Sequence, residues 1–147
     1  MKVLLVNGSP HKEGCTYTAL SEIAMTLEKH GIDSEIFWIG NRPLGGCIAC
    51  GACRTKGACV FDDAVNVFRE KIASADGFIF GSPVHYSAPS GQIVSFLHRC
   101  FFAGSDAFRG KPGAAVVSCR RGGSTAAFEQ LNQYFTISSM PVVSSQY

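Results

Sequence analysis

Apolar residues along this chain alternate between short continuous runs and stretches with helical spacing. Four runs have the length and composition of buried strands, and a fifth begins near the end of the chain: residues 2–6, 34–39, 77–81, 113–118 and 141–143. Between these runs, apolar residues recur three or four positions apart, as on one face of a helix: Leu20, Ile23, Ala24 and Leu27; Val65, Phe68 and Ile72; Ile93, Phe96, Leu97 and Phe101; and Phe128, Leu131 and Phe135. The pattern therefore predicts strands and helices in regular alternation.

This alternation predicts an α/β fold. Strands that are separated by helices pair in parallel through right-handed crossovers, which gives a sheet covered on both faces. The 147 residues, 46% of them hydrophobic, suit a single domain over residues 1–147, without repeats or linkers. At the helix starts, Asp62 or Asp63 and Ser124 are in position to act as N-caps. A helix would also be needed after the fifth strand; either the chain continues beyond Tyr147, or a neighbouring subunit covers that face.

The stretch from Asn7 to Thr16 joins the first strand to the first helix and is rich in Gly, Ser, Thr and Lys. Such a turn directs backbone N–H groups and hydroxyls at one point, where the helix N-terminus adds partial positive charge. This favours a bound phosphate over the alternative, an ordinary capped connection. Both G-x-x-x-x-G-K-[ST] and G-x-G-x-x-G are absent. A single terminal phosphate, as in FMN, therefore fits better than a pyrophosphate.

Two further loops, residues 82–91 and 119–124, follow the third and fourth strands. Since the carboxyl ends of parallel strands lie at one edge of a sheet, the three loops are expected to surround one crevice. The second loop offers apolar, aromatic and backbone groups that suit a flat ring with hydrogen-bonding edges. The third offers two arginines. The alternative is a Pro-containing turn and two solvated arginines.

Four cysteines, Cys47, Cys50, Cys53 and Cys59, lie in an insertion over residues 45–61 that has little regular-structure signal. Thiols crowded on a short irregular loop are not core residues. Bacterial ferredoxins have a similar C-x2-C-x2-C run, but a Pro follows their fourth cysteine, whereas Val60 follows here. Zinc would also accept four thiolates, although structural zinc sites usually use two separated pairs. An iron–sulfur cluster, zinc, a redox disulfide and no metal at all are the alternatives.

The glycine, serine and threonine pattern of the first loop resembles that of the NADPH-dependent FMN reductases and their relatives, the iron–sulfur flavoproteins. The likeness extends over nearly the whole chain, and the spacing of the four cysteines resembles the compact [4Fe–4S] motif of the iron–sulfur flavoproteins. This resemblance implies a flavodoxin-like, three-layer, doubly wound fold with five parallel strands in the order 2-1-3-4-5. It also implies bound FMN.

The resemblance assigns residues to FMN by position. The first loop would hold the phosphate through Ser9, Gly14, Cys15 and Thr16, with His11 or Thr18. The second would line the flavin ring through Pro83, Val84, His85, Tyr86 and Ser87. The third would bracket the pyrimidine end of the ring through Ser118, Arg120, Arg121, Gly122 and Gly123. An arginine there could offset negative charge that develops when the flavin is reduced.

The function implied is an FMN-dependent NAD(P)H oxidoreductase of the iron–sulfur flavoprotein type. A nicotinamide would give hydride to the flavin, and electrons would then pass to a small-molecule or protein acceptor, directly or through a cluster. His85 and Tyr86 are candidates for proton relays. The alternatives are an FMN and iron–sulfur electron shuttle without nicotinamide activity, and a redox-sensing FMN-binding regulator. The choice between NADH and NADPH stays open.

Charge and composition narrow the choice of partners. The formal net charge of +2, without a stripe of Lys or Arg, argues against nucleic acid and against a strongly acidic electron carrier. With no long apolar segment and no signal peptide before the first strand, we expect a cytoplasmic protein without membrane contact. Seven cysteines in that compartment are more often reduced, metal-bound or catalytic than paired. Exposed apolar surface near the site would favour a homodimer or homotetramer.

Overall fold

The computed structural model describes residues 1–144 of the chain. Its strands are β1 (Lys2–Asn7), β2 (Asp33–Trp38), β3 (Gly77–His85), β4 (Ala88–Pro89) and β5 (Gly113–Ser118). Its helices are α1 (Cys15–Lys29), α2 (Ala52–Lys56), α3 (Ala64–Ile72), α4 (Gly91–Phe102) and α5 (Ser124–Ile137), with one 3-10 turn, η1 (Ser105–Ala107). No helix in this described part of the chain combines the length and apolar character needed to cross a membrane.

The sheet has the predicted parallel order. β2, β1, β3 and β5 lie side by side in that sequence, and every neighbouring pair is parallel. Beyond β5, Val142 forms one parallel bridge to Gly113, where a fifth strand was expected to begin. If the two-residue β4 is left out of the count, the four parallel strands have the order 2-1-3-4, and the expected fifth strand is represented only by the Val142 bridge. The prediction of a doubly wound α/β fold is therefore confirmed.

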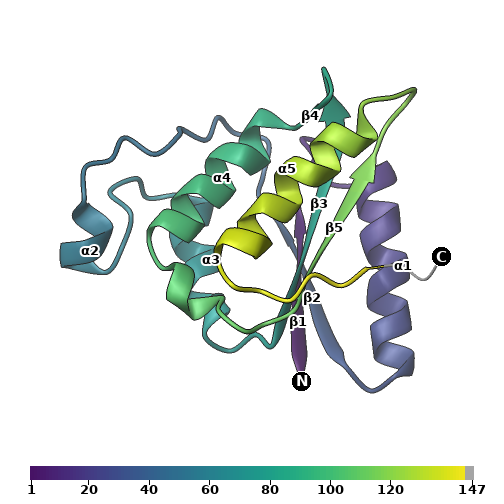
Figure 1. The fold of residues 1–147 in the computed structure, drawn as a ribbon, viewed down its shortest axis with the longest axis horizontal. Coiled ribbons are helices and arrows are strands. Elements are labelled where there is room, and N and C mark those ends of the chain that lie inside the picture. Colours follow the sequence, from purple (N-terminus) through teal and green to yellow (C-terminus); the bar gives the residue numbers. More distant parts are fainter. Residues whose placement is uncertain (145–147) are drawn as a thin grey trace.

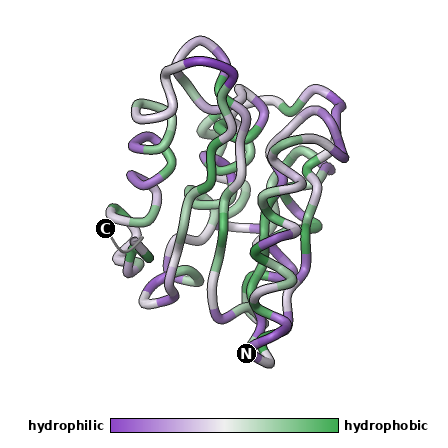
Figure 2. The backbone as a smooth tube through the Cα atoms, turned by 90° about the vertical axis from the view of Figure 1, so that its right-hand side faces the viewer, coloured by the Kyte–Doolittle hydropathy of each residue, from purple (hydrophilic) through white to green (hydrophobic). Residues whose placement is uncertain are grey.

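The helices form two layers, one on each side of the sheet. Helix α1 covers one face, and α3, α4 and α5 cover the other (Figure 1). Because side chains alternate along a strand, Phe78 and Phe80 of β3 point into the second layer. Their rings lie 4.8 Å from Phe108 and 5.1 Å from Phe135, respectively. Figure 2 shows hydrophobic segments along the inner strands and polar residues at their end turns.

Three local predictions are corrected by the structure. β3 continues four residues past Gly81, because pairing with β5 extends to Pro83 and a hairpin with β4 follows. Helix α5 is capped by the left-handed backbone of Gly123, and Ser124 is its first helical residue. The insertion that was expected to be irregular contains the short helix α2. By contrast, the Asp63 side chain caps α3 by accepting from the Val65 N–H at 3.0 Å, as predicted.

Gly113 allows α5 to pack directly on the backbone of β5. A Cβ at this position would lie 2.4 Å from Cδ1 of the buried Phe135 ring. Gly113→Ala is therefore expected to lower the free energy of unfolding by about 1–3 kcal/mol, the usual cost of overpacking. Urea denaturation measures this change. Gly91→Ala is the control, since a Cβ there meets nothing within 4 Å and its stability should stay close to that of the wild type.

Candidate functional site

Three loops meet at the carboxyl edge of the sheet. The Gly8 N–H donates to the Gly81 carbonyl at 2.8 Å, which joins the loop after β1 to β3. The Ser90 hydroxyl donates to the Gly8 carbonyl at 2.6 Å, which adds the start of α4. The hydroxyls of Thr16 and Ser118 lie 3.0 Å apart, so the start of α1 is bonded to the end of β5. The structure thus brings the first and third loops against the end of β3, as expected from the topology.

The first loop is organised by a buried asparagine. Asn7 is fully buried; its side-chain amide donates to the Lys12 carbonyl at 3.0 Å, and its side-chain oxygen accepts from the Ser9 N–H at 3.0 Å. The Ser9 hydroxyl then accepts from the His11 N–H at 3.1 Å, and the Trp38 ring N–H donates to the Ser9 carbonyl at 2.9 Å. Sequence reasoning missed Asn7 and Trp38. An asparagine that ends a strand before Gly-Ser-Pro was the available signal, because such side chains commonly bond to the backbone two residues on.

Helix α1 begins in this loop with an open N-terminus. Its N-cap is Gly14, in extended conformation, and no side chain caps the first turn. The first N–H groups of a helix have no partner within the helix, and they carry partial positive charge. Thr16 is buried, whereas Cys15 is exposed and Thr18 donates its hydroxyl to the Gly14 carbonyl at 3.2 Å. The turn can therefore bind an anion through backbone N–H groups and the hydroxyls beside them.

The second loop is a tight hairpin at the end of β3. Tyr86 and Ser87 connect β3 to β4 with φ angles of 50° and 61°, both in the left-handed region. Two such residues form the type I′ turn that suits a two-residue hairpin, but non-glycine residues adopt it at some energetic cost. The hairpin displays the Tyr86 side chain fully exposed, with His85 exposed beside it. This places an aromatic side chain at the rim of the site.

The third loop packs closely on this hairpin. Gly123 has a φ of +83°, and a Cβ there would lie 2.6 Å from the Ser87 hydroxyl. Arg120, Arg121 and Gly122 are exposed, so both guanidinium groups are accessible to a ligand. The residues predicted to contact FMN lie in the first loop, the end of β3 and the third loop, among them Ser9, His11, Pro83, Val84 and Gly123. These segments are therefore bonded or packed together at one edge of the sheet.

The four cysteines of the insertion line one small pocket. Its volume is about 20 Å³, and it is closed by apolar groups and one arginine: Ile48, Val60, Phe61, Phe102 and Arg99. Cys47 and Cys50 are exposed, and Cys53 and Cys59 are partly buried. Within residues 1–144, no three His, Cys, Asp or Glu side chains are placed to hold a metal ion. The structure thus gathers the thiols around one pocket, but it does not bring them together as a metal site would require.

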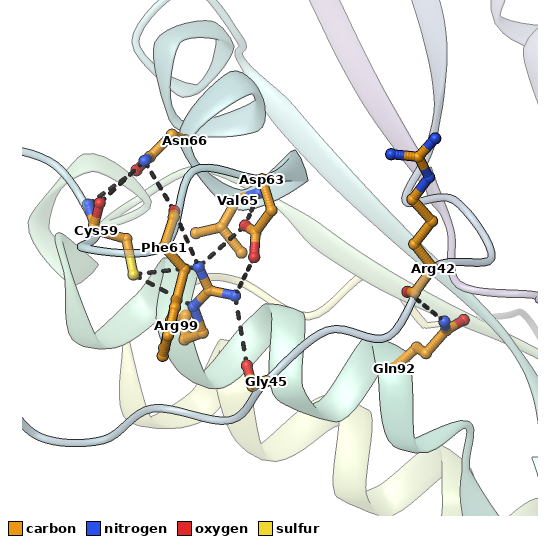
Figure 3. A network of polar contacts seen from close by, with 9 residues as sticks. All are labelled: Arg42, Gly45, Cys59, Phe61, Asp63, Val65, Asn66, Gln92 and Arg99. Atoms are coloured by element: carbon orange, nitrogen blue, oxygen red, sulfur yellow. Dashed lines mark hydrogen bonds and ion pairs between the residues drawn. The ribbon is translucent and has the colours of Figure 1, made fainter.

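A buried arginine lies at this pocket. Arg99 of α4 donates to both carboxylate oxygens of Asp63, at 2.7 and 2.9 Å, and to Cys59 Sγ at 3.1 and 3.3 Å (Figure 3). Its guanidinium stacks 4.9 Å from the centre of the Phe61 ring. Burial disfavours the charge, but the hydrogen bonds to Asp63 and Cys59 outweigh it, so the pKa of Arg99 is raised above its ordinary value. Sequence reasoning missed Arg99, although a charged residue beside the apolar face of a helix was a signal.

The remaining two cysteines lie elsewhere. Cys100 is buried in the core, and burial raises the pKa of its thiol. Cys119 is exposed directly after β5, as the first residue of the third loop. Neither lines the pocket of the other thiols.

Comparisons with known proteins agree with this arrangement. The sequence profile of the family described as NADPH-dependent FMN reductase matches residues 1–147. An iron-sulfur flavoprotein of Methanocaldococcus jannaschii is 34% identical over 147 residues, which cover 97% of this chain and 76% of that protein.

Solved structures support the fold. The NAD(P)H:quinone oxidoreductase from Methanothermobacter marburgensis superposes with a TM-score of 0.74 at 15% identity, covering 99% of this chain and 85% of that one. A flavodoxin from the domain Archaea superposes with a TM-score of 0.68 at 16% identity, covering 99% of this chain and 80% of that one. The fold is therefore flavodoxin-like, and the chain belongs to the NADPH-dependent FMN reductase family of oxidoreductases.

Proposed function

We propose that this protein is an FMN-dependent NAD(P)H oxidoreductase of the iron–sulfur flavoprotein type. The observation that carries the proposal is the edge of the sheet where the open N-terminus of α1 meets the ends of β3 and β5. Ligands of doubly wound folds bind at the carboxyl ends of the strands, and a helix N-terminus favours phosphate. Family membership and the iron-sulfur flavoprotein relative point to the same chemistry.

The residues present fit FMN in kind and in position. Backbone N–H groups of the first turn of α1, with Ser9, Thr16 and the nearby His11, would bind the phosphate. The β3 end and its hairpin would lie along the ring, and the third loop would approach the pyrimidine end. When bound, FMN supplies the redox chemistry, since it accepts hydride from a nicotinamide and passes electrons to an acceptor.

The chain itself contributes placement and electrostatics. Arg120 and Arg121 are exposed in the third loop, where either guanidinium could stabilise negative charge near the pyrimidine oxygens. The exposed hairpin leaves His85 and Tyr86 free to contact the second substrate or to relay a proton. Close packing of Gly123 on Ser87 fixes the spacing between the two loops that would bracket the ring.

One experiment tests this function and separates it from its rivals. Protein purified without oxygen is expected to release FMN on heating, identified by mass, and its visible spectrum to bleach when NADPH or NADH is added. FAD, or no flavin after reconstitution, would exclude the proposed site. An electron shuttle would keep an oxidised spectrum with either nicotinamide. A regulator would show turnover too slow for metabolism together with a partner that binds only one redox state.

Thr16 provides a specific test of the phosphate site. Thr16→Val keeps the side-chain volume but removes the buried hydroxyl, so FMN should bind more weakly by about 1.5–3 kcal/mol, as for a hydrogen bond to a charged group. Titration of apoprotein with FMN measures the loss. The control is Thr26→Val on the same helix, whose hydroxyl donates only to the Glu22 carbonyl, at 2.9 Å. Equal FMN affinity in both variants would show that the phosphate lies elsewhere.

Iron–sulfur ligation is proposed for the cysteine pocket. Four thiols match the ligand type and number that a [4Fe–4S] cluster takes, and all four line the same pocket. Their present positions do not form a metal site within the described residues, so the loop would have to close around the cluster. Cys47, Cys50, Cys53 and Cys59 would be the ligands. The cytoplasmic location stays a prediction.

We also expect self-association through the surface beside this pocket. A groove of about 670 Å³ is lined by side chains of α4 and α5 and by the cysteine loop, including Phe101, Phe102, Tyr134, Ile137 and Cys47. Phe102 and Ile137 are 47% and 83% exposed, which is unusual for large apolar side chains so close together. Light scattering should therefore show a homodimer or homotetramer at micromolar concentration.

Two variants locate that interface. Ile137→Lys should shift the protein toward the monomer, because the charge would have to be buried between subunits. Met25→Lys on α1, where the side chain is 45% exposed on the other face of the sheet, should leave the assembly unchanged. A monomeric wild-type protein with FMN bound would contradict the expectation.

A further inference from the structure

Arg99 connects the helical layer to a single cysteine of the pocket. Its side chain is only 1% exposed, although it carries a charge. The guanidinium uses Nε and Nη2 toward Cys59 Sγ, at 3.3 and 3.1 Å, and it uses Nη1 and Nη2 toward the Asp63 carboxylate (Figure 3). Nη1 also donates to the Gly45 carbonyl at 3.3 Å, near the start of the insertion. One side chain therefore touches both ends of the cysteine loop.

The backbone of Cys59 is held independently. The Asn66 side chain accepts from the Cys59 N–H at 2.8 Å and donates to the Cys59 carbonyl at 3.0 Å. Asn66 belongs to α3, whose first turn is capped by Asp63, the ion-pair partner of Arg99. Cys59 is thus fixed at its backbone and at its sulfur by two helices of the core layer. Cys47 and Cys50, in contrast, are exposed on the outer part of the loop.

We propose that Arg99 is a positioning residue that holds Cys59 in place as a preformed ligand of the cysteine site. It also sets the reduction potential of the cluster that assembles there. The proposal rests on the iron–sulfur part of the proposed function. Cys47, Cys50 and Cys53 close onto the fixed Cys59, which explains why the thiols line one pocket without already forming a metal site.

The hydrogen bonds to sulfur give Arg99 a redox role as well as a structural one. N–H groups that point at a ligand sulfur stabilise the more negative, reduced state of a cluster, so they raise its reduction potential. Asp63 offsets the charge of Arg99, but the two N–H dipoles toward Cys59 Sγ remain. Lysine cannot reproduce this contact, because its single ammonium lacks the planar fork that serves the carboxylate and the sulfur together.

The test is the midpoint potential of the cluster in anaerobically reconstituted full-length protein. Wild type, Arg99→Lys and Arg54→Lys are compared by iron and sulfide content and by dithionite titration with mediator dyes. Each step adds one electron from the reductant to the cluster. Arg54 is the matched control: it lies on α2 within the cysteine loop and stacks on the Phe102 ring at 5.4 Å. Its substitution should leave the potential unchanged.

Arg99→Lys is expected to make the cluster at least tenfold harder to reduce, a fall of about 59 mV for one electron. Loss of iron from a variant that keeps a native circular dichroism spectrum and binds FMN would also support the proposal, because it would show that the cluster needs Cys59 held in place by Arg99. An unchanged potential at full iron content would overturn it while the proposed function stands. Wild-type protein that binds no iron would instead overturn the iron–sulfur function itself, and this inference with it.

Asp63→Asn gives a second measurement if Arg99→Lys does not fold. It removes the negative charge that offsets Arg99 and leaves both N–H groups in reach of Cys59 Sγ, so the potential should rise. An unchanged potential in this variant would contradict a redox role for the network.

Discussion

Cys50→Ser is expected to abolish iron binding and electron transfer to the terminal acceptor. Cluster ligation needs four thiolates at one centre, so the loss of one should remove most of the effect of all four. FMN binding and hydride uptake from NAD(P)H should persist, because the proposed flavin site lies in other loops, at the carboxyl ends of β1, β3 and β5. Cys50 is exposed, so serine there should change stability by no more than about 0.5 kcal/mol. Iron analysis, flavin content and anaerobic reduction by NADPH measure the three properties separately.

Cys119→Ser is the matched control for iron content, since Cys119 is equally exposed but does not line the cysteine pocket. If Cys50→Ser loses FMN as well, the insertion forms part of the flavin pocket. If the anaerobic wild type contains no iron and Cys50→Ser keeps full turnover, the protein is a plain FMN reductase, and its cysteines serve another purpose.

Arg99→Met should be strongly destabilising. It keeps much of the apolar stem but leaves Asp63 unpaired beside the core, and breaking a buried ion pair costs about 3–5 kcal/mol. We expect the lower end, about 3 kcal/mol, because the Asp63 side chain is 25% exposed. The α3 cap should weaken too, since Asp63 also accepts from the Val65 N–H. Urea denaturation of the apoprotein measures the change without any bound group.

An exposed pair of the same type is the control for this effect. Arg109 and Asp106 lie 3.5 Å apart with 71% and 92% of their side chains exposed. Arg109→Met should change the free energy of unfolding by less than about 1 kcal/mol, because solvent screens such pairs. Equal effects of the two substitutions would show that Arg99 is not a buried structural charge.

Much of the fold could be predicted from local patterns. Apolar runs and helical spacing are properties of a few neighbouring residues, and they located β1, β2, β5 and the helices α1, α3, α4 and α5 to within a few positions. Asp63 was recognisable as a cap for the same reason. The meeting of the three loops proposed to hold the flavin also follows from the order of elements, because parallel strands place their carboxyl ends at one edge.

Features that depend on pairing between distant segments were not predictable in this way. β3 continues past Gly81 because β5 pairs with Pro83, and no local signal in Ser-Pro-Val-His distinguishes that from a loop. The Tyr86–Ser87 turn adopts left-handed backbone without a glycine, so the usual hairpin signal is missing.

The amino-acid sequence by itself determined the alternation of strands and helices, the polar turn before α1 and the spacing of the four cysteines, because each depends on residues near one another in the chain. The tertiary structure alone decided which groups surround those cysteines. Arg99 lies 40 residues from Cys59, and only the packing of α4 against α3 brings its guanidinium to the sulfur and to Asp63. A buried charge must find its partners wherever the fold supplies them, so its role appears only in three dimensions.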